Sequence, residues 1–145
     1  MSTRVLSQGS SLFVPAIIAG IIGGIIVDAF LSIELHLSPV ALETHNATIA
    51  AGPGASPLLG VIVHFVTAIG WALIYAYVFN AIRKLQNWIV GAIVLGVVGN
   101  AVMNLMITMK TGAPWSKGFV ADLIPNVVFY ALPVALFLAR TVRRA

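Results

Sequence analysis

The chain has 145 residues, of which 60% are hydrophobic and only 8% are charged, and its mean hydropathy is +1.04. A soluble domain carries roughly 25% charged residues, so this composition excludes an ordinary soluble protein and predicts a lipid bilayer as the solvent. The length allows one compact domain over residues 1–145. Because the chain has no cysteine, disulfide bonds, thiolate metal ligands and a cysteine nucleophile are also excluded.

Four apolar runs, near 12–34, 58–80, 88–109 and 119–139, are each long enough to cross a membrane as a helix, which takes about 20 residues. The first run is longer than the apolar core of a signal peptide and contains Asp28, so we interpret it as an uncleaved helix rather than a cleaved leader. Short connections join the last three runs, which predicts antiparallel neighbours. The sequence therefore predicts an all-α fold, a single membrane domain of four transmembrane helices in an up-down-up-down bundle.

Basic residues are concentrated on one predicted side of the membrane. They precede the first run, occupy the turn between the second and third runs, and end the chain: Arg4, Arg83, Lys84, Arg140, Arg143 and Arg144. The opposite side has Lys110 and Lys117, and the long outer loop 35–57 has no basic residue. Cytoplasmic loops are enriched in Lys and Arg, so this pattern predicts that both termini are cytoplasmic. We interpret the Arg-rich tail as this signal and not as a nucleic-acid site.

A glycine precedes a polar residue by four positions in each predicted helix. The pairs are Gly24 and Asp28, Gly60 and His64, Gly96 and Asn100, and Gly118 and Asp122, and Gly20 extends the first stripe by one turn. Small residues at this spacing let membrane helices approach closely. We therefore expect these five glycines to serve helix packing within or between chains, with the polar residue of each stripe facing protein.

Six polar residues are predicted to lie at similar depth below the outer boundary of the membrane: Asp28, His64, Asn100, Asn104, Asp122 and Asn126. An ionised Asp near the bilayer centre costs about 2.5–3.5 kcal/mol, so we expect Asp28 and His64 to pair. Asn100 and Asn104 share one helix face, as do Asp122 and Asn126. Two interpretations remain open for this layer: interhelical hydrogen bonds that hold the bundle, or a binding site for an ion or small ligand.

The outer loop 35–57 contains the other candidate ligands, His36, Glu43 and His45. Imidazole and carboxylate groups suit zinc or copper. Their spacing matches no metal motif, however, and a solvated loop is the favoured interpretation, with a short surface helix over residues 40–51 as an option. No cofactor is indicated by the sequence.

Three segments within residues 63–115 carry a family resemblance: "VHFVTAIGWALIYAYV", "LQNWIVGAIVLGVVGNAVMN" and "TGAPW". Together they resemble the C-terminal part of the YagU-type bacterial inner-membrane proteins. The chain departs from that family in its shorter outer loop and in having Asn104 where a second histidine is expected. The resemblance implies a multi-pass protein of the bacterial inner membrane and draws attention to His64 and Asn104, but it implies no particular activity.

The sequence contains no Gly-rich phosphate loop, no HExxH motif and no serine elbow, so an enzyme is not expected. The small size favours a non-enzymatic accessory or self-assembling subunit of a membrane complex. The polar layer favours the alternative, a small transporter, sensor or ligand-binding protein. The expected partners are the lipid bilayer and further copies or other subunits of a complex, but not nucleic acid.

Overall fold

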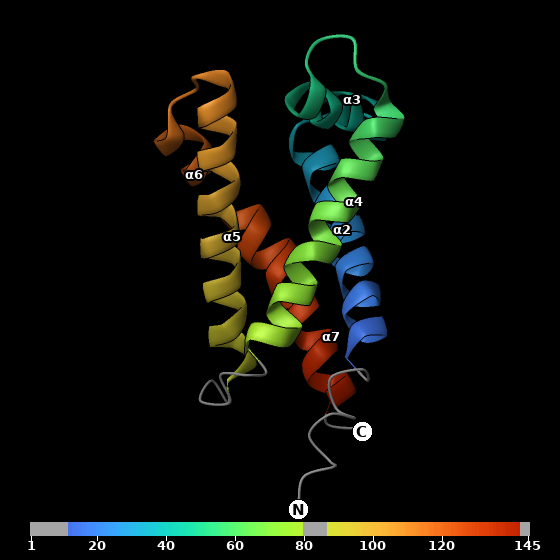
Figure 1. Ribbon diagram of the computed structural model, residues 1–145, viewed down its shortest axis with the longest axis vertical. Coiled ribbons are helices and arrows are strands. Elements are labelled where there is room, and N and C mark those ends of the chain that lie inside the picture. The colour runs from blue at the N-terminus through green and yellow to red at the C-terminus, as the bar shows by residue number, and fades with distance from the viewer. Residues whose placement is uncertain (1–11, 80–86, 143–145) are drawn as a thin grey trace, which may run out of the picture.

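The computed structural model describes residues 12–79 and 87–142, and most of these residues are helical (Figure 1). Four helical stretches are long and apolar enough to cross a membrane: Phe13–Glu34, Pro57–Val78, Trp88–Thr111 and Trp115–Thr141. The described residues form no β-strand. These findings confirm the predicted all-α fold with four candidate membrane spans.

The helices follow the order α2 (Phe13–Glu34), α3 (Pro39–Ala51), α4 (Pro57–Ile74), α5 (Trp88–Thr111), α6 (Trp115–Ile124) and α7 (Leu132–Val142). Two π-helical segments complete the spans: η1 (Tyr75–Phe79) continues α4, and η2 (Pro125–Ala131) joins α6 to α7. The fourth span begins at Trp115 and not near residue 119, because Pro114 has the extended backbone that precedes a helix.

The predicted outer loop 35–57 contains a helix, α3. The Ser38 hydroxyl accepts a hydrogen bond from the Ala41 backbone N–H at 3.2 Å, and Pro39 occupies the first turn, where its missing donor is harmless. Gly52 ends the helix with a φ of 97°, a conformation that favours glycine. The optional helix over residues 40–51 is therefore found, whereas the solvated-loop interpretation is wrong for this segment, because one face of α3 packs on α4 and α2.

The spans run alternately up and down the long axis, but they do not form a closed ring (Figure 1). α2 packs along α4, whereas the fourth span crosses diagonally, contacting α5 through α6 and both α5 and α2 through η2 and α7. α4 and α5 diverge toward the end of the molecule where α3 lies (Figure 1). The bundle is consequently open between its second and third spans.

Small residues make the close helix contacts. The most buried of them are alanines on six different helical segments, each 0% exposed: Ala16, Ala19, Ala47, Ala72, Ala92, Ala131 and Ala135. Lipid tails are as apolar as leucine, so membrane helices gain little from burying large apolar side chains and associate through close backbone packing instead. Many large apolar side chains accordingly remain outside, with Ile25, Val66 and Val120 each more than half exposed.

The basic residues that predict the orientation lie mostly outside this part of the chain. Arg4, Arg83, Lys84, Arg143 and Arg144 fall outside the described residues, and Arg140 near the end of α7 is the one that lies within them. The cytoplasmic position of the termini therefore stays a prediction.

Candidate functional site: a cavity between the second and third spans

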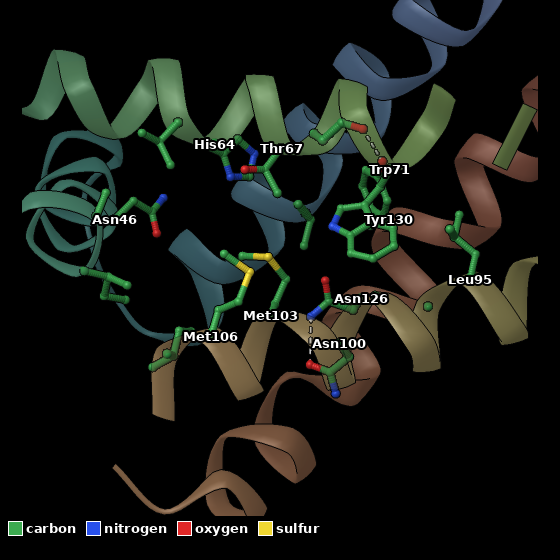
Figure 2. Close-up of a pocket in the computed structure, with 18 of the residues that line it drawn as sticks. Asn46, His64, Thr67, Trp71, Leu95, Asn100, Met103, Met106, Asn126 and Tyr130 are labelled. Atoms are coloured by element: carbon green, nitrogen blue, oxygen red, sulfur yellow. Dashed lines mark hydrogen bonds between the residues drawn. The ribbon is translucent and has the colours of Figure 1, made fainter. Parts of the chain in front are cut away.

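A cavity of about 410 Å³ occupies the opening between α4 and α5 (Figure 2). Its α4 wall consists of residues at helical spacing: Val63, His64, Thr67, Ala68 and Trp71. Its α5 wall is a longer face of the same kind: Leu95, Gly96, Gly99, Asn100, Met103, Met106, Ile107 and Lys110. Most of this lining is apolar, and a few polar side chains interrupt it.

The π-helical segment η2 closes the back of the cavity with Asn126 and Tyr130. Pro125 lacks a backbone donor and so cannot form the regular α-helical hydrogen bond, which accounts for the wider turn that follows it. The Tyr130 hydroxyl donates to the Ala68 carbonyl on α4, and this contact ties the fourth span to the second. Figure 2 shows the Asn126 amide oxygen and the Trp71 indole nitrogen directed into the space.

The end of the cavity near α3 is lined by Asn46, Ile49 and Ala50. Lys110, in the last turn of α5, donates a hydrogen bond through its ammonium group to the Ala50 carbonyl. This contact bridges α5 and α3 across the open side of the bundle. The cavity is thus bounded at this end by α3.

His64 stands between the cavity and a group of acidic side chains. Its Nε2 lies 3.3 Å from Asp28 Oδ2 and 3.4 Å from the Gly24 carbonyl oxygen, both on α2. The His64 and Asp28 side chains are 16% and 19% exposed. The predicted proximity of these two residues is therefore found, although Asp28 itself does not line the cavity.

Glu43 on α3 completes this group. Its side chain is only 7% exposed, and its carboxylate interacts electrostatically with both Asp28 and His64. Glu43 Oε2 also accepts a hydrogen bond from Asn46 Nδ2 at 3.3 Å. A Cβ on Gly60 would overlap the Glu43 carbonyl oxygen, so glycine at this position is what lets α3 lie directly on α4.

A second polar group consists of amides and one carboxylate on the opposite wall. Asn100 is fully buried, and its Nδ2 donates to the Phe119 carbonyl at 2.7 Å. Asn100 Oδ1 accepts from Asn104 Nδ2 at 2.8 Å and from Asn126 Nδ2 at 3.3 Å. Asn104 Nδ2 also lies 3.4 Å from Asp122 Oδ2. This network joins α5, α6 and η2.

The six residues of the predicted polar layer therefore divide into two groups. Asp28 and His64 lie with Glu43 on the α2, α3 and α4 side, whereas Asn100, Asn104, Asp122 and Asn126 form the amide network. Of the six, His64, Asn100 and Asn126 line the cavity between the two groups. The six residues therefore do not converge on one point, and three of them face the cavity from opposite sides.

The predicted packing glycines all lie at close contacts within the chain. A Cβ at Gly20 would meet the Ile69 backbone at 2.7 Å, one at Gly24 the His64 and Phe65 rings, and one at Gly96 the Val127 Cα at 2.7 Å. Gly60 and Gly118 face Glu43 and Asn104 in the same way.

The three metal candidates of the outer loop do not come together. Glu43 is buried, whereas His36 and His45 are exposed. Among the described residues, no group of three or more His, Cys, Asp or Glu side chains is arranged to hold a metal ion.

Several lining residues were missed by the sequence interpretation, notably Asn46, Thr67 and Lys110. Thr67 lies three residues after His64 and so on nearly the same helix face, a signal that was available. Asn46 and Lys110 gave no such signal, because they reach the cavity through the placement of α3 across the end of the bundle.

The fold and the cavity define a class, multi-pass α-helical membrane proteins with a pocket between two spans. Comparisons of the chain with protein-family models, curated proteins and solved structures gave no match. The resemblance to the YagU-type proteins stays a prediction, and the function is inferred from the cavity and its side chains.

Proposed function

We propose that this protein binds a small, mostly apolar molecule in the cavity between α4 and α5, as a transporter, sensor or ligand-binding protein of the membrane. The cavity itself is the observation that carries this proposal. Its volume of about 410 Å³ lies within the range of roughly 300–1,000 Å³ that ligand pockets occupy. Ligand pockets also combine an apolar lining with a few convergent polar groups, as this one does with His64, Asn100 and Asn126.

The alternative, an accessory or self-assembling subunit, is favoured by the small size of the chain, with glycine stripes that serve contacts within or between chains. The five glycines of those stripes are occupied by contacts inside this chain. The polar side chains are likewise directed inward, toward the cavity or toward one another. Both features support the ligand-binding function over the accessory one.

The membrane setting that goes with this proposal is the bacterial inner membrane, with both termini in the cytoplasm. In that orientation α3 and the wide end of the cavity lie toward the outer side. A ligand then has access either from the outer aqueous phase beneath α3 or from the outer leaflet between α4 and α5.

A blocked cavity tests the proposal. Thr67 lines the cavity, whereas its neighbour Val66 is 65% exposed on the lipid-facing side of α4. Thr67→Phe places a ring in the cavity, and Val66→Phe adds the same ring outside it. The wild type and both variants are extracted from native membranes in mild detergent, and bound molecules are measured by native mass spectrometry.

We expect a bound small molecule on the wild type and on Val66→Phe, and its loss from Thr67→Phe. If all three chains carry the same molecule, it does not occupy this cavity. If the wild type carries none and is recovered with other protein subunits, the accessory function is correct instead.

A further inference from the structure

The charge that Lys, Arg, Asp and Glu side chains contribute to the cavity lining is positive. Lys110 contributes an ammonium group at the α3 end, and no carboxylate is found among the described residues that line the space. The two carboxylates nearest the α4 wall, Asp28 and Glu43, are directed toward His64 and each other. A ligand in the cavity therefore meets a cation at one end without a compensating acid beside it.

The Lys110 ammonium group has capacity for such a ligand. It carries three N–H donors, of which the Ala50 carbonyl accepts one. A carbonyl oxygen satisfies a donor without neutralising the charge. Lys110 is also exposed, so an incoming head group reaches it without displacing a buried side chain.

Below Lys110 the α5 wall of the cavity is apolar as far as Asn100. Met103, Met106 and Ile107 on α5 face Val63 on α4, and methionine side chains adapt to irregular ligand shapes. Lys110 and Asn100 are ten residues apart on one straight face, which corresponds to about 15 Å at a rise of about 1.5 Å per residue. An elongated apolar wall with an ammonium group at one end suits an alkyl chain that carries an anionic head group.

We propose that the ligand is an anionic single-chain amphiphile of the fatty-acid type. Its carboxylate pairs with Lys110 beneath α3, and its alkyl chain lies along Met103 and Met106 toward Trp71. This inference rests on the proposed function, since it names the chemical class of ligand for the same cavity.

Trp71 allows the inference to be tested directly, because it lines the inner part of the cavity. Trp88→Phe and Trp115→Phe leave it as the only tryptophan of the chain. This parent protein is placed in nanodiscs of a neutral lipid and titrated with ω-brominated undecanoate or with the matching undecanol, whose bromine quenches tryptophan on contact. Concentrations are expressed as mole fraction in the bilayer, so that partitioning into lipid does not enter the comparison.

We expect the acid to quench Trp71 at about tenfold lower mole fraction than the alcohol. Lys110→Met keeps the length of the side chain and removes its charge, so it should bring the acid to the level of the alcohol. Lys110→Arg should retain the preference for the acid. Lys117→Met is the matched control, since Lys117 is exposed on α6 away from the cavity lining, and it should behave as the parent.

Equal quenching by acid and alcohol in the parent, with both weakened by Thr67→Phe, would overturn the anionic head group while leaving the ligand-binding function intact. Quenching that is the same in the parent and in Thr67→Phe for both probes would remove the proposed function together with this inference. An unchanged preference for the acid in Lys110→Met would show that Lys110 does not recognise the head group.

Discussion

The two polar groups beside the cavity differ in how completely their hydrogen bonds are satisfied. In the amide network, Asn100 uses both its donor and its acceptor groups, and Asn104 and Asn126 bind to it from two other positions. In the charged group, Asp28 Oδ1 is buried and has no hydrogen-bond partner among the described residues. A carboxylate oxygen buried in this way costs free energy, because charged and polar groups in the membrane are costly when they lack partners.

The comparison separates two roles for buried polar residues in one small bundle. A network of three amides and the Asp122 carboxylate can hold helices together, since its members bind one another where the membrane supplies no water. An incompletely satisfied charged group costs free energy and is expected where function requires it. We therefore expect substitutions in the amide network to change stability, and substitutions in the charged group to change binding.

The charged group (Asp28, His64 and Glu43) requires that α3 packs closely on α4, and Gly60→Ala should disrupt this packing. The added Cβ would overlap the Glu43 backbone carbonyl, which cannot move unless α3 shifts from α4. We expect the free energy of unfolding to fall by about 3 kcal/mol, the upper part of the usual range for overpacking. Unfolding by SDS in mixed micelles, followed by far-UV circular dichroism, measures it.

Gly70→Ala is the matched control on the same helix, because a Cβ there meets nothing within 4 Å. It should raise the stability by about 0.5–1 kcal/mol through helix propensity. Equal effects of the two substitutions would mean that α3 is not seated on Gly60 and that Glu43 does not belong to the charged group.

Asn100→Ala should break the amide network and lower the free energy of unfolding by about 2 kcal/mol. The substitution removes the side-chain donor to the Phe119 carbonyl and the Oδ1 acceptor that the Asn104 and Asn126 amides share. Asn104 keeps its bonds to the Asn100 carbonyl and Asp122 Oδ2, and Asn126 keeps its bond to the Asp122 carbonyl. The same SDS titration applies, with Val98→Ala as control, since Val98 is 49% exposed on the same helix. A cost no greater than that of Val98→Ala would remove the structural role of the network.

Gly118→Ala should cost less than Gly60→Ala, because its added Cβ would overlap a side chain and not the backbone. Asn104 Oδ1 occupies that position, and it can turn away only by giving up part of its hydrogen bonding. We expect a loss of about 1 kcal/mol, at the low end for overpacking. In an Asn104→Ala background the cost should disappear, and an unchanged cost there would mean that the two residues are not coupled.

The sequence predicts those features of this molecule that depend on local patterns. The four spans follow from runs of apolar residues, and the contacts at Gly20 and Gly96 follow from the spacing of small residues along a single helix. The proximity of Asp28 and His64 follows from equal depth on sequential spans. Each of these features can be predicted from the sequence of one helix or of two neighbouring helices.

The cavity and the role of Glu43 could not be predicted in this way. The cavity lies where the fourth span packs against both α2 and α5 while α4 and α5 stay apart, which is a relation among four helices. Glu43 is buried because α3 lies on Gly60, and nothing in "ALETHNA" distinguishes that face from a solvated one. The spacing of small residues predicts that Gly60 makes a close helix contact, but it does not predict that the contacting residue is Glu43.

The smallest effect on stability is expected for Asp28→Asn, and this substitution tests the comparison most directly. Asparagine keeps the shape of the side chain and a hydrogen-bonding atom 3.3 Å from His64 Nε2, while it removes the carboxylate that also interacts with Glu43. The free energy of unfolding should therefore change by less than about 1 kcal/mol.

Binding should respond to Asp28→Asn more strongly than stability does. The Asp28 carboxylate and the Gly24 carbonyl determine which His64 tautomer and ring orientation face the cavity. We expect severalfold weaker quenching of Trp71 by the brominated acid, with Glu34→Gln, an exposed acid at the end of α2, as the unaffected control. If Asp28→Asn destabilises the protein as much as Asn100→Ala and leaves binding unchanged, the charged group is a second structural network and His64 is part of the scaffold alone.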